Sequence, residues 1–183
     1  MDSIIAPDNR AVAFAVKSSG GWDSPRDLYR WDFGKGGTPE LVVDGVRGSC
    51  RRMMAFTPNS RAMVFVDPNR NVVTYNIAAR KAVASFPTLR ADHQGASVWN
   101  LELCLSPDGK TLALANPAML AVDLWDLESG PLRYTLPPSM GRILCLNWSP
   151  DGQRLAVAWS DGMIEIWNLA KVERVLAELG FAS

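Results

Sequence analysis

The sequence contains few of the residues on which metal and nucleophile chemistry depends. Among its 183 residues are one histidine, His93, and three widely spaced cysteines, Cys50, Cys104 and Cys145, which form no CxxC pair. Metal sites in short sequence windows usually show such paired spacings. A Ser-His-Asp arrangement needs a histidine beside a nucleophile and a third group to orient it. We therefore expect no enzyme and no catalytic, cofactor-binding or metal-binding residues.

The sequence has neither an excess of one charge nor a long apolar run. Nineteen basic residues balance nineteen acidic ones, whereas a protein that neutralises many phosphates usually carries a basic excess. This balance argues against nucleic-acid binding. No stretch approaches the roughly 20 apolar residues of a transmembrane helix, and the N-terminus MDSIIAPDNR lacks the features of a secretory signal. We expect a cytoplasmic protein without a membrane span.

One order of elements occurs four times along the chain. A strand leads into a tight turn with a proline, and then into a second strand. A third strand ends in an aromatic residue followed by Asp or Asn. The turn prolines, at intervals of 51, 49 and 43 residues, are Pro7, Pro58, Pro107 and Pro150. The third-strand pairs, at intervals of 44, 50 and 42 residues, are Trp31-Asp32, Tyr75-Asn76, Trp125-Asp126 and Trp167-Asn168. Because the turn prolines and the third-strand pairs recur at similar intervals, we interpret them as parts of one structural repeat.

The residues of one repeat suit a small antiparallel sheet. Proline, Asp and Gly favour a tight turn, and Ile164 and Ile166 alternate with the polar Glu165 as in a strand with two different faces. A short sheet cannot bury both of its faces alone, so neighbouring sheets must stack. We predict an all-β fold of four four-stranded antiparallel blades. The approximate blade boundaries are 1–45, 46–88, 89–138 and 139–169.

These features resemble the WD-repeat (WD40) family of β-propellers, over residues from about 3 to 169. The pairing of Ser-Pro-Asp-Gly with a downstream Trp-Asp is specific, and it is strongest in the last two repeats. The resemblance implies blades stacked radially around a central channel, with the third-strand aromatic residues packed between them. The family's Gly-His pair is missing, because the lone His93 is followed by Gln94-Gly95 and lies 14 residues before Pro107.

A short amphipathic helix and tail are predicted over residues 170–183. Val172, Val175, Leu176 and Leu179 recur at helical spacing, and Gly180 suits the left-handed residue that ends a helix. This ending is similar to the C-terminal part of large bacterial WD-repeat proteins. Two alternatives stay open for the helix: it covers an exposed blade face, or it recruits a partner.

The number of repeats, four, does not determine how the blades form a closed ring. The chain could form one end of a larger propeller, close on itself, or pair with a second copy in an eight-bladed ring. Residues 1–91 carry a net charge of +5, and residues 92–183 carry −5. Opposite charges favour contact between the N-terminal part of one copy and the C-terminal part of another.

Candidate partner-binding residues are large or basic and fall on predicted loops or at their edges. Trp and Arg are over-represented among residues that dominate binding energy, and Arg47, Arg51 and Arg52 form the one compact basic cluster in the sequence. The remaining candidates are Trp22, Arg70, His93, Trp99, Arg142 and Trp159.

The resemblance and the lack of catalytic and metal-binding residues together favour a non-catalytic scaffold for protein–protein interaction. One form of this hypothesis is that the scaffold assembles with itself into a closed propeller. An alternative is the regulatory or sensory C-terminal part of a larger bacterial signalling protein such as a kinase. A propeller enzyme is the least favoured hypothesis. The identity of the protein partner cannot be inferred from the sequence.

Overall fold

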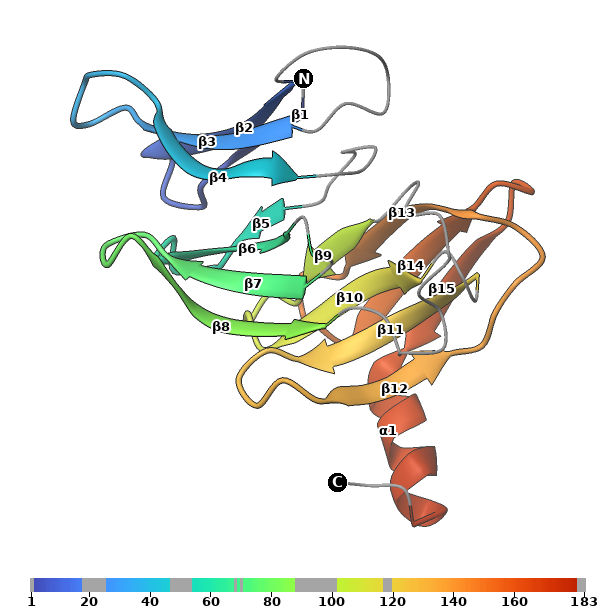
Figure 1. Cartoon of the computed structure of the whole chain (residues 1–183). Coiled ribbons are helices and arrows are strands. Elements are labelled where there is room, and N and C mark those ends of the chain that lie inside the picture. The colour runs from blue at the N-terminus through green and yellow to red at the C-terminus, as the bar shows by residue number, and fades with distance from the viewer. Residues whose placement is uncertain are drawn as a thin grey trace. The chain divides into compact units, whose positions relative to one another are not determined.

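The computed structural model describes residues 2–17, 26–46, 54–67, 69, 71–87, 102–116 and 120–180. The chain divides into two compact units, residues 1–101 and residues 102–183. Within the described ranges the secondary structure consists of fifteen β-strands and one α-helix (Figure 1). The predicted all-β class with a C-terminal helix is thus confirmed.

The first unit contains two antiparallel sheets of four strands each. Each sheet follows the order of the sequence, so that every strand pairs with its neighbours along the chain. The first sheet consists of β1 (Asp2–Ile5), β2 (Ala11–Lys17), β3 (Arg26–Asp32) and β4 (Glu40–Val46). The second sheet consists of β5 (Met54–Phe56), β6 (Ala62–Val66), β7 (Asn71–Asn76) and β8 (Lys81–Pro87).

The second unit contains two further antiparallel sheets and the helix. Its first sheet consists of β9 (Leu103–Leu105), β10 (Thr111–Asn116), β11 (Ala121–Asp126) and β12 (Leu132–Leu136). Its second sheet consists of β13 (Ile143–Trp148), β14 (Arg154–Trp159) and β15 (Ile164–Asn168). The helix α1 (Leu169–Glu178) follows β15 directly.

The last sheet differs from the prediction, because it has three strands among the described residues rather than four. The difference arises at the Asp or Asn that ends each third strand. Asp32 accepts a hydrogen bond from the backbone N–H of Gly34, and Asp126 accepts bonds from Glu128 and Ser129, so that both side chains close the turn that leads to a fourth strand.

Asn168 makes the same kind of bond but starts a helix. Its side chain accepts a hydrogen bond from the backbone N–H of Lys171 at 3.0 Å, as the N-cap of α1. Asn is among the best N-cap residues, because its short side chain satisfies one of the donors that a helix start leaves unpaired. The residues that follow are good helix formers such as Ala, Lys, Glu and Leu. Gly and Pro, which follow Asp32 and Asp126, are absent at this point.

The proline turn between the first and second strands has one geometry in all four repeats. Its fourth residue takes a positive φ, at Gly109 (74°) and Gly152 (69°) and also at the non-glycine residues Asn9 (58°) and Ser60 (57°). Asparagine tolerates this region better than most residues. The turns of the first and second repeats, which have Asn9 and Ser60 in place of glycine, therefore keep the same backbone conformation.

In the third repeat this turn is closed by Asp108. Its carboxylate accepts hydrogen bonds from the Ser106 hydroxyl and from the backbone N–H of Lys110, and these two donors hold its pKa below the usual value. The Ser106 oxygen in turn accepts from the backbone N–H of Thr111 at 2.9 Å. Side chain and backbone thus close one small network.

Removing the Asp108 carboxylate is expected to lower the free energy of unfolding by about 0.5–1.5 kcal/mol, the net value of an ordinary hydrogen bond. We predict this loss for Asp108→Ala in urea denaturation followed by circular dichroism. Asp108→Asn is the matched control, because Asn59 already fills the equivalent place and accepts from Thr57 and Arg61. The control should keep most of the stability, and equal losses in both variants would contradict this account.

Because the native pKa is lowered, the stabilisation by Asp108 is present above the unfolded pKa and is lost as the pH falls through the native pKa. The Asp108→Asn variant should therefore lose less stability than the wild-type protein on acidification.

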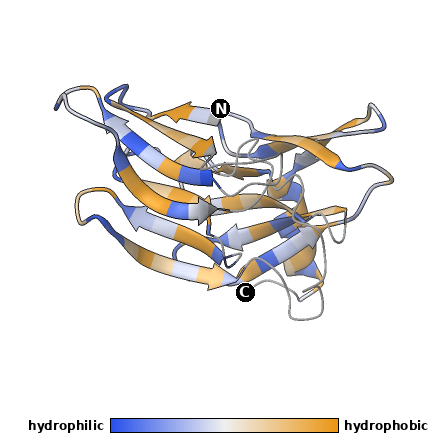
Figure 2. Cartoon of the chain, turned by 45° about the horizontal axis from the view of Figure 1, so that its top comes forward, coloured by the Kyte–Doolittle hydropathy of each residue, from blue (hydrophilic) through white to orange (hydrophobic). Residues whose placement is uncertain are grey.

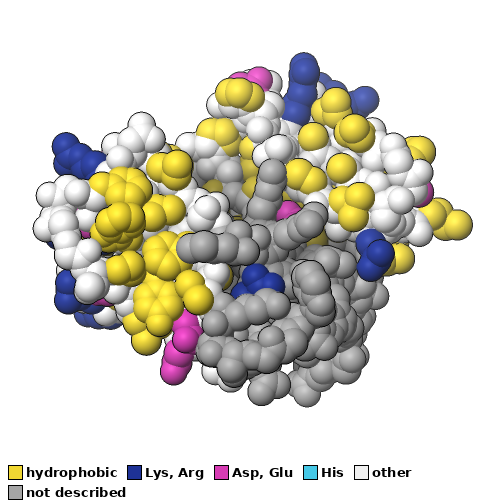
Figure 3. Space-filling model, turned by 90° about the horizontal axis from the view of Figure 1, so that it is seen from above, with side chains coloured by type: hydrophobic (Ala, Val, Ile, Leu, Met, Phe, Trp, Pro, Cys, Tyr) yellow, Lys and Arg dark blue, Asp and Glu magenta, His cyan; other side chains and the backbone are white. Residues whose placement is uncertain are grey.

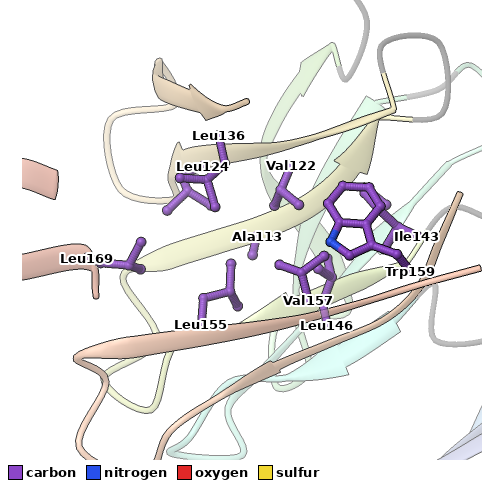
Figure 4. Close-up of a cluster of buried hydrophobic side chains, with 11 residues drawn as sticks. Ala113, Val122, Leu124, Leu136, Ile143, Leu146, Leu155, Val157, Trp159 and Leu169 are labelled. Carbon is purple, nitrogen blue, oxygen red and sulfur yellow. The ribbon is translucent and has the colours of Figure 1, made fainter. Parts of the chain in front are cut away.

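Within each unit the two sheets pack face to face. In the first unit, alanines of β2 and Leu28 lie against Met63 and Phe65 of β6 in one buried cluster. In the second unit, Ala113 and Ala115 lie against the β13–β15 sheet in another cluster (Figure 4). Hydrophobic and polar residues alternate along several of the strands (Figure 2). The period of two places one row of side chains in the core and the next row on the opposite face.

The helix does not cover the outer face of the last sheet, which was one of its two predicted roles. Its first residue, Leu169, is buried in the core of the second unit, whereas Val175 and Leu179 are exposed. Glu173 forms an ion pair with Arg133 of β12, with 2.9 Å between Oε1 and Nη2. The helix ends before Gly180, which has a φ of 79° as expected for a left-handed terminating residue.

Candidate functional site

Most of the predicted contact residues lie outside the described part of the chain. These residues are Trp22, Arg47, Arg51, Arg52, Arg70, His93 and Trp99. Their proposed roles stay predictions. The described structure places the other two candidates, Arg142 and Trp159, and it shows two exposed apolar sheet faces that the sequence interpretation missed.

Arg142 lies where two loops of the last sheet meet. Its backbone N–H donates to the Ser160 hydroxyl at 2.9 Å, and its carbonyl accepts from the Ser160 N–H at 2.8 Å. Next to it, a Cβ at Gly141 would lie 3.2 Å from the backbone nitrogens of Ser160 and Asp161, so any larger residue would crowd this close approach. The loop before β13 and the loop before β15 are thus held together, with Arg142 exposed on them.

Trp159, which the sequence offered as a candidate partner-binding residue, is buried as a packing residue in this structure. It is 2% exposed and belongs to the core of the second unit (Figure 4). Its indole Nε1 donates to Glu165 Oε2 at 3.0 Å, and the Nε1 of Trp167 donates to the same oxygen at 3.3 Å. At the end of an alternating strand, its parity places it on the same inward face as Leu155 and Val157.

A cavity of about 520 Å³ opens in the second unit beside the proline turns and the start of α1. Asp108, Asp151 and Glu173 bring carboxylates to its wall, and Arg133 is already paired with Glu173. Burial, reinforced by the nearby Glu173 carboxylate, raises the pKa of Tyr134 in this wall to about 12. Among the described residues no group of three or more His, Cys, Asp and Glu is placed to hold a metal ion.

One face of the first sheet is apolar and uncovered. We call it the first-sheet face. Strand register and alternation place on it Ile5, Val12, Phe14, Val16, Tyr29, Trp31 and Leu41, together with the polar Ser3 and Asp27. Its aromatic rings are ordered in pairs, since Phe14 stacks on Tyr29 at 5.8 Å between ring centroids and Trp31 meets Phe33 edge to face at 5.4 Å. Trp31 is nevertheless 40% exposed and Ile5 63% exposed. Figure 3 shows hydrophobic side chains gathered over this sheet, at the left of the view.

One face of the last sheet is apolar and uncovered as well. We call it the last-sheet face. The register places on it Cys145, Ala156, Ala158, Ile164 and Ile166, together with the polar Asn147, Arg154 and Asn168. Ile164 is 70% exposed and Ile166 is 68% exposed. Contiguous apolar surface of this kind on a folded protein commonly marks an interaction site.

The comparisons with known proteins agree with the repeat. The family model described as the anaphase-promoting complex subunit 4 WD40 domain matches residues 134–177, which include β13, β14 and β15. The chain is 42% identical to human coronin-7 over 49 residues, and 25% identical over 145 residues to the Arabidopsis thaliana protein named cell division cycle 20.1, cofactor of APC complex. Over residues 134–177 the chain is thus similar to a WD40 domain. The matched segments span only 5% of coronin-7 and 29% of the Arabidopsis protein, and they cover 27% and 77% of this chain.

A third relative, Arabidopsis thaliana autophagy-related protein 16, is 33% identical over 95 residues, which are 51% of this chain and 18% of that protein. The predicted likeness to bacterial WD-repeat proteins in particular stays a prediction. None of the helices in the described ranges has the length and apolar character that crossing a membrane requires.

The third-strand aromatic residue of each repeat lies on the same side of its sheet. By strand register, Trp31, Tyr75, Trp125 and Trp167 occupy equivalent places opposite a second-strand residue. Tyr75 and Trp167 pack against the core shared with the preceding sheet of their unit. Trp31 occupies this place in the first sheet, and there it contributes to the exposed first-sheet face.

Small residues mark the opposite side of three of the four sheets, whereas β6 carries Val64 and Val66 there. The side that packs on the following sheet carries Ala13 and Ala15 in β2, and Ala113 and Ala115 in β10. In β14 the same places hold Ala156 and Ala158, which belong to the last-sheet face. The recurrence is visible in the sequence as RAVAFAV, TLALAN and RLAVAW. Comparing these three strands could have found the last-sheet face without a structure.

Proposed function

We propose that this WD-repeat chain is a non-catalytic scaffold of the cytoplasm, which binds protein partners through surfaces held in place by its sheets. The observation that carries the proposal is the pair of exposed apolar sheet faces, since folded monomers rarely expose large contiguous apolar patches. Relatives support it by their names, because one is a cofactor of the APC complex and the matching family model describes a subunit of such a complex.

Photo-crosslinking in cells tests this proposal. A photoreactive amino acid placed at Trp31 or at Ile166, in the first-sheet and last-sheet faces, should give protein adducts of the full chain. The same amino acid at Met140, which is 94% exposed and outside both faces, is the matched control and should give few. The proposal would be wrong if the faces gave no more adducts than Met140.

We further propose that a second copy of the chain is one of these partners, and that two copies close one ring of eight blades. The two units support this by their charge, because residues 1–101 carry thirteen basic and nine acidic residues while residues 102–183 carry six and ten. The basic unit of one copy therefore attracts the acidic unit of another. A homodimer would have about 40 kDa, twice the 20.0 kDa of the chain.

The second candidate function is a regulatory part of a larger signalling protein, such as a bacterial kinase. The segments that match this chain are small parts of much longer relatives, which is compatible with a regulatory part of a longer protein. In that case the exposed faces would be covered by further blades of the same polypeptide. A messenger RNA that joins this reading frame to an upstream domain would support this candidate over the separate scaffold.

A further inference from the structure

We infer that the first-sheet face of one copy packs on the last-sheet face of a second copy, and that the pair of copies makes this contact twice. This inference rests on the self-association proposed above and names the surfaces that carry it. Such a contact is heterologous, because two different patches meet. A twofold arrangement of two copies satisfies both patches of each copy and leaves neither exposed.

The last-sheet face has the composition of a surface that is buried elsewhere in the same chain. By register, Ile164 and Ile166 stand opposite Ala158 and Ala156, as Val122 and Leu124 stand opposite Ala115 and Ala113. Val122 and Leu124 are at most 1% exposed, because they lie in the core shared with the sheet β13–β15. The equivalent isoleucines have no following sheet within the described chain.

The first-sheet face matches the other side of the same kind of contact. Val12 and Phe14 occupy the register places of Leu155 and Val157, each opposite or next to the aromatic residue of the third strand. Leu155 and Val157 are fully buried against the alanine-bearing side of the preceding sheet. The first-sheet face is therefore built to receive an alanine-bearing side.

One rule accounts for both packed pairs of sheets. In each unit, a side with small second-strand residues, Ala13 and Ala15 or Ala113 and Ala115, meets a side with large ones, such as Met63 and Phe65. The last-sheet face is of the first kind and the first-sheet face is of the second kind. Contact between them extends the rule, whereas pairing of two identical faces would place large residues on large or small on small, and would leave the other face uncovered.

Charge indicates the same pairing. The first-sheet face belongs to the unit with a net charge of +4, and the last-sheet face belongs to the unit with a net charge of −4. Contact between unlike faces brings opposite charges together twice. Contact between like faces would bring two units of the same sign together, which costs affinity.

A pair of complementary variants tests the inference with the full chain. Trp31→Glu places a negative charge on the first-sheet face, and Ile166→Lys places a positive charge on the last-sheet face. Ile166 is 68% exposed and Trp31 is 40% exposed, so each variant is expected to fold, which circular dichroism checks. By light scattering the wild-type chain should have a mass near 40 kDa, and each variant alone near its 20.0 kDa chain mass.

An equimolar mixture of the two variants should return to about twice the 20.0 kDa chain mass. In the mixed pair one contact joins two unaltered faces, and the other joins the new glutamate to the new lysine. Met140→Lys is the control for a charge added outside both faces, and it should keep the wild-type mass.

Three results would overturn the inference: a wild-type chain that is monomeric, a variant that stays dimeric alone, or a mixture that stays monomeric. A monomeric wild-type chain that still gives crosslinks to other proteins at Trp31 or Ile166 would leave the scaffold proposal standing. A dimer that survives either substitution would leave self-association standing and would remove only this choice of surfaces.

Discussion

Replacing Leu155 by Ala should lower the free energy of unfolding of the second unit by about 2–5 kcal/mol, the range for a buried leucine that leaves a cavity. Leu155 is 0% exposed and lies in the middle of the core between the two sheets of this unit. Strands on either side fix its surroundings, so little collapse into the space is expected. Urea denaturation followed by tryptophan fluorescence measures the change, since four tryptophans lie in this unit.

Leu179→Ala is the matched control for Leu155→Ala. It removes the same atoms in the same unit, but Leu179 is 64% exposed at the end of α1. Surface substitutions of this kind usually change stability by less than about 0.5 kcal/mol. Similar losses in the two variants would show that the core of the second unit is packed differently from this description.

Raising the pH from about 10 to about 12 should destabilise the second unit through Tyr134, by less than about 2 kcal/mol, because the side chain is only partly buried and solvent screens part of the effect. The native pKa is raised to about 12 by burial and by the Glu173 carboxylate. In this range the unfolded chain loses the phenolic proton while the native chain keeps it. The stabilisation is therefore complete below pH 10 and is lost as the pH rises toward the native pKa.

The measurement compares urea midpoints of the wild-type protein and Tyr134→Phe at these two pH values. The variant has no phenolic proton to lose, so its stability should fall less than that of the wild-type protein. Glu173→Gln should take an intermediate course, because it removes the carboxylate but keeps the burial of Tyr134. Parallel pH profiles in all three proteins would assign the alkaline destabilisation to other groups.

The repeat made most of the fold predictable from the sequence. Turn prolines and third-strand aromatic residues recur in every sheet, and each is tied to local backbone geometry, so each could be located without a partner element. The missing fourth strand of the last sheet could not be inferred from the absence of glycine and proline after Asn168, because Asn76 is also followed by neither and still leads into β8. Only the longer run of helix formers after Asn168 distinguishes the last repeat.

The candidate site was harder to predict, because exposure depends on which neighbour is present. Trp159 has the residue type of a contact residue, yet strand parity places it in the core. Ile164 and Ile166 have the residue type of a core and are exposed. The position of a residue in a single loop or strand does not distinguish a buried residue such as Trp159 from an exposed one such as Ile166. Comparison with the equivalent Val122 and Leu124 separates them, because it shows what a following sheet covers.

The hydrogen bond of Asn168 has a consequence for engineering longer arrays. The same side-chain geometry precedes a hairpin after Asp126 and a helix after Asn168, so the cap itself is neutral between the two outcomes. The roughly ten residues that follow determine whether a fourth strand or a helix forms. Grafting residues 127–136, which contain β12, in place of α1 is expected to give the last sheet a fourth strand, to which further sheets could be joined.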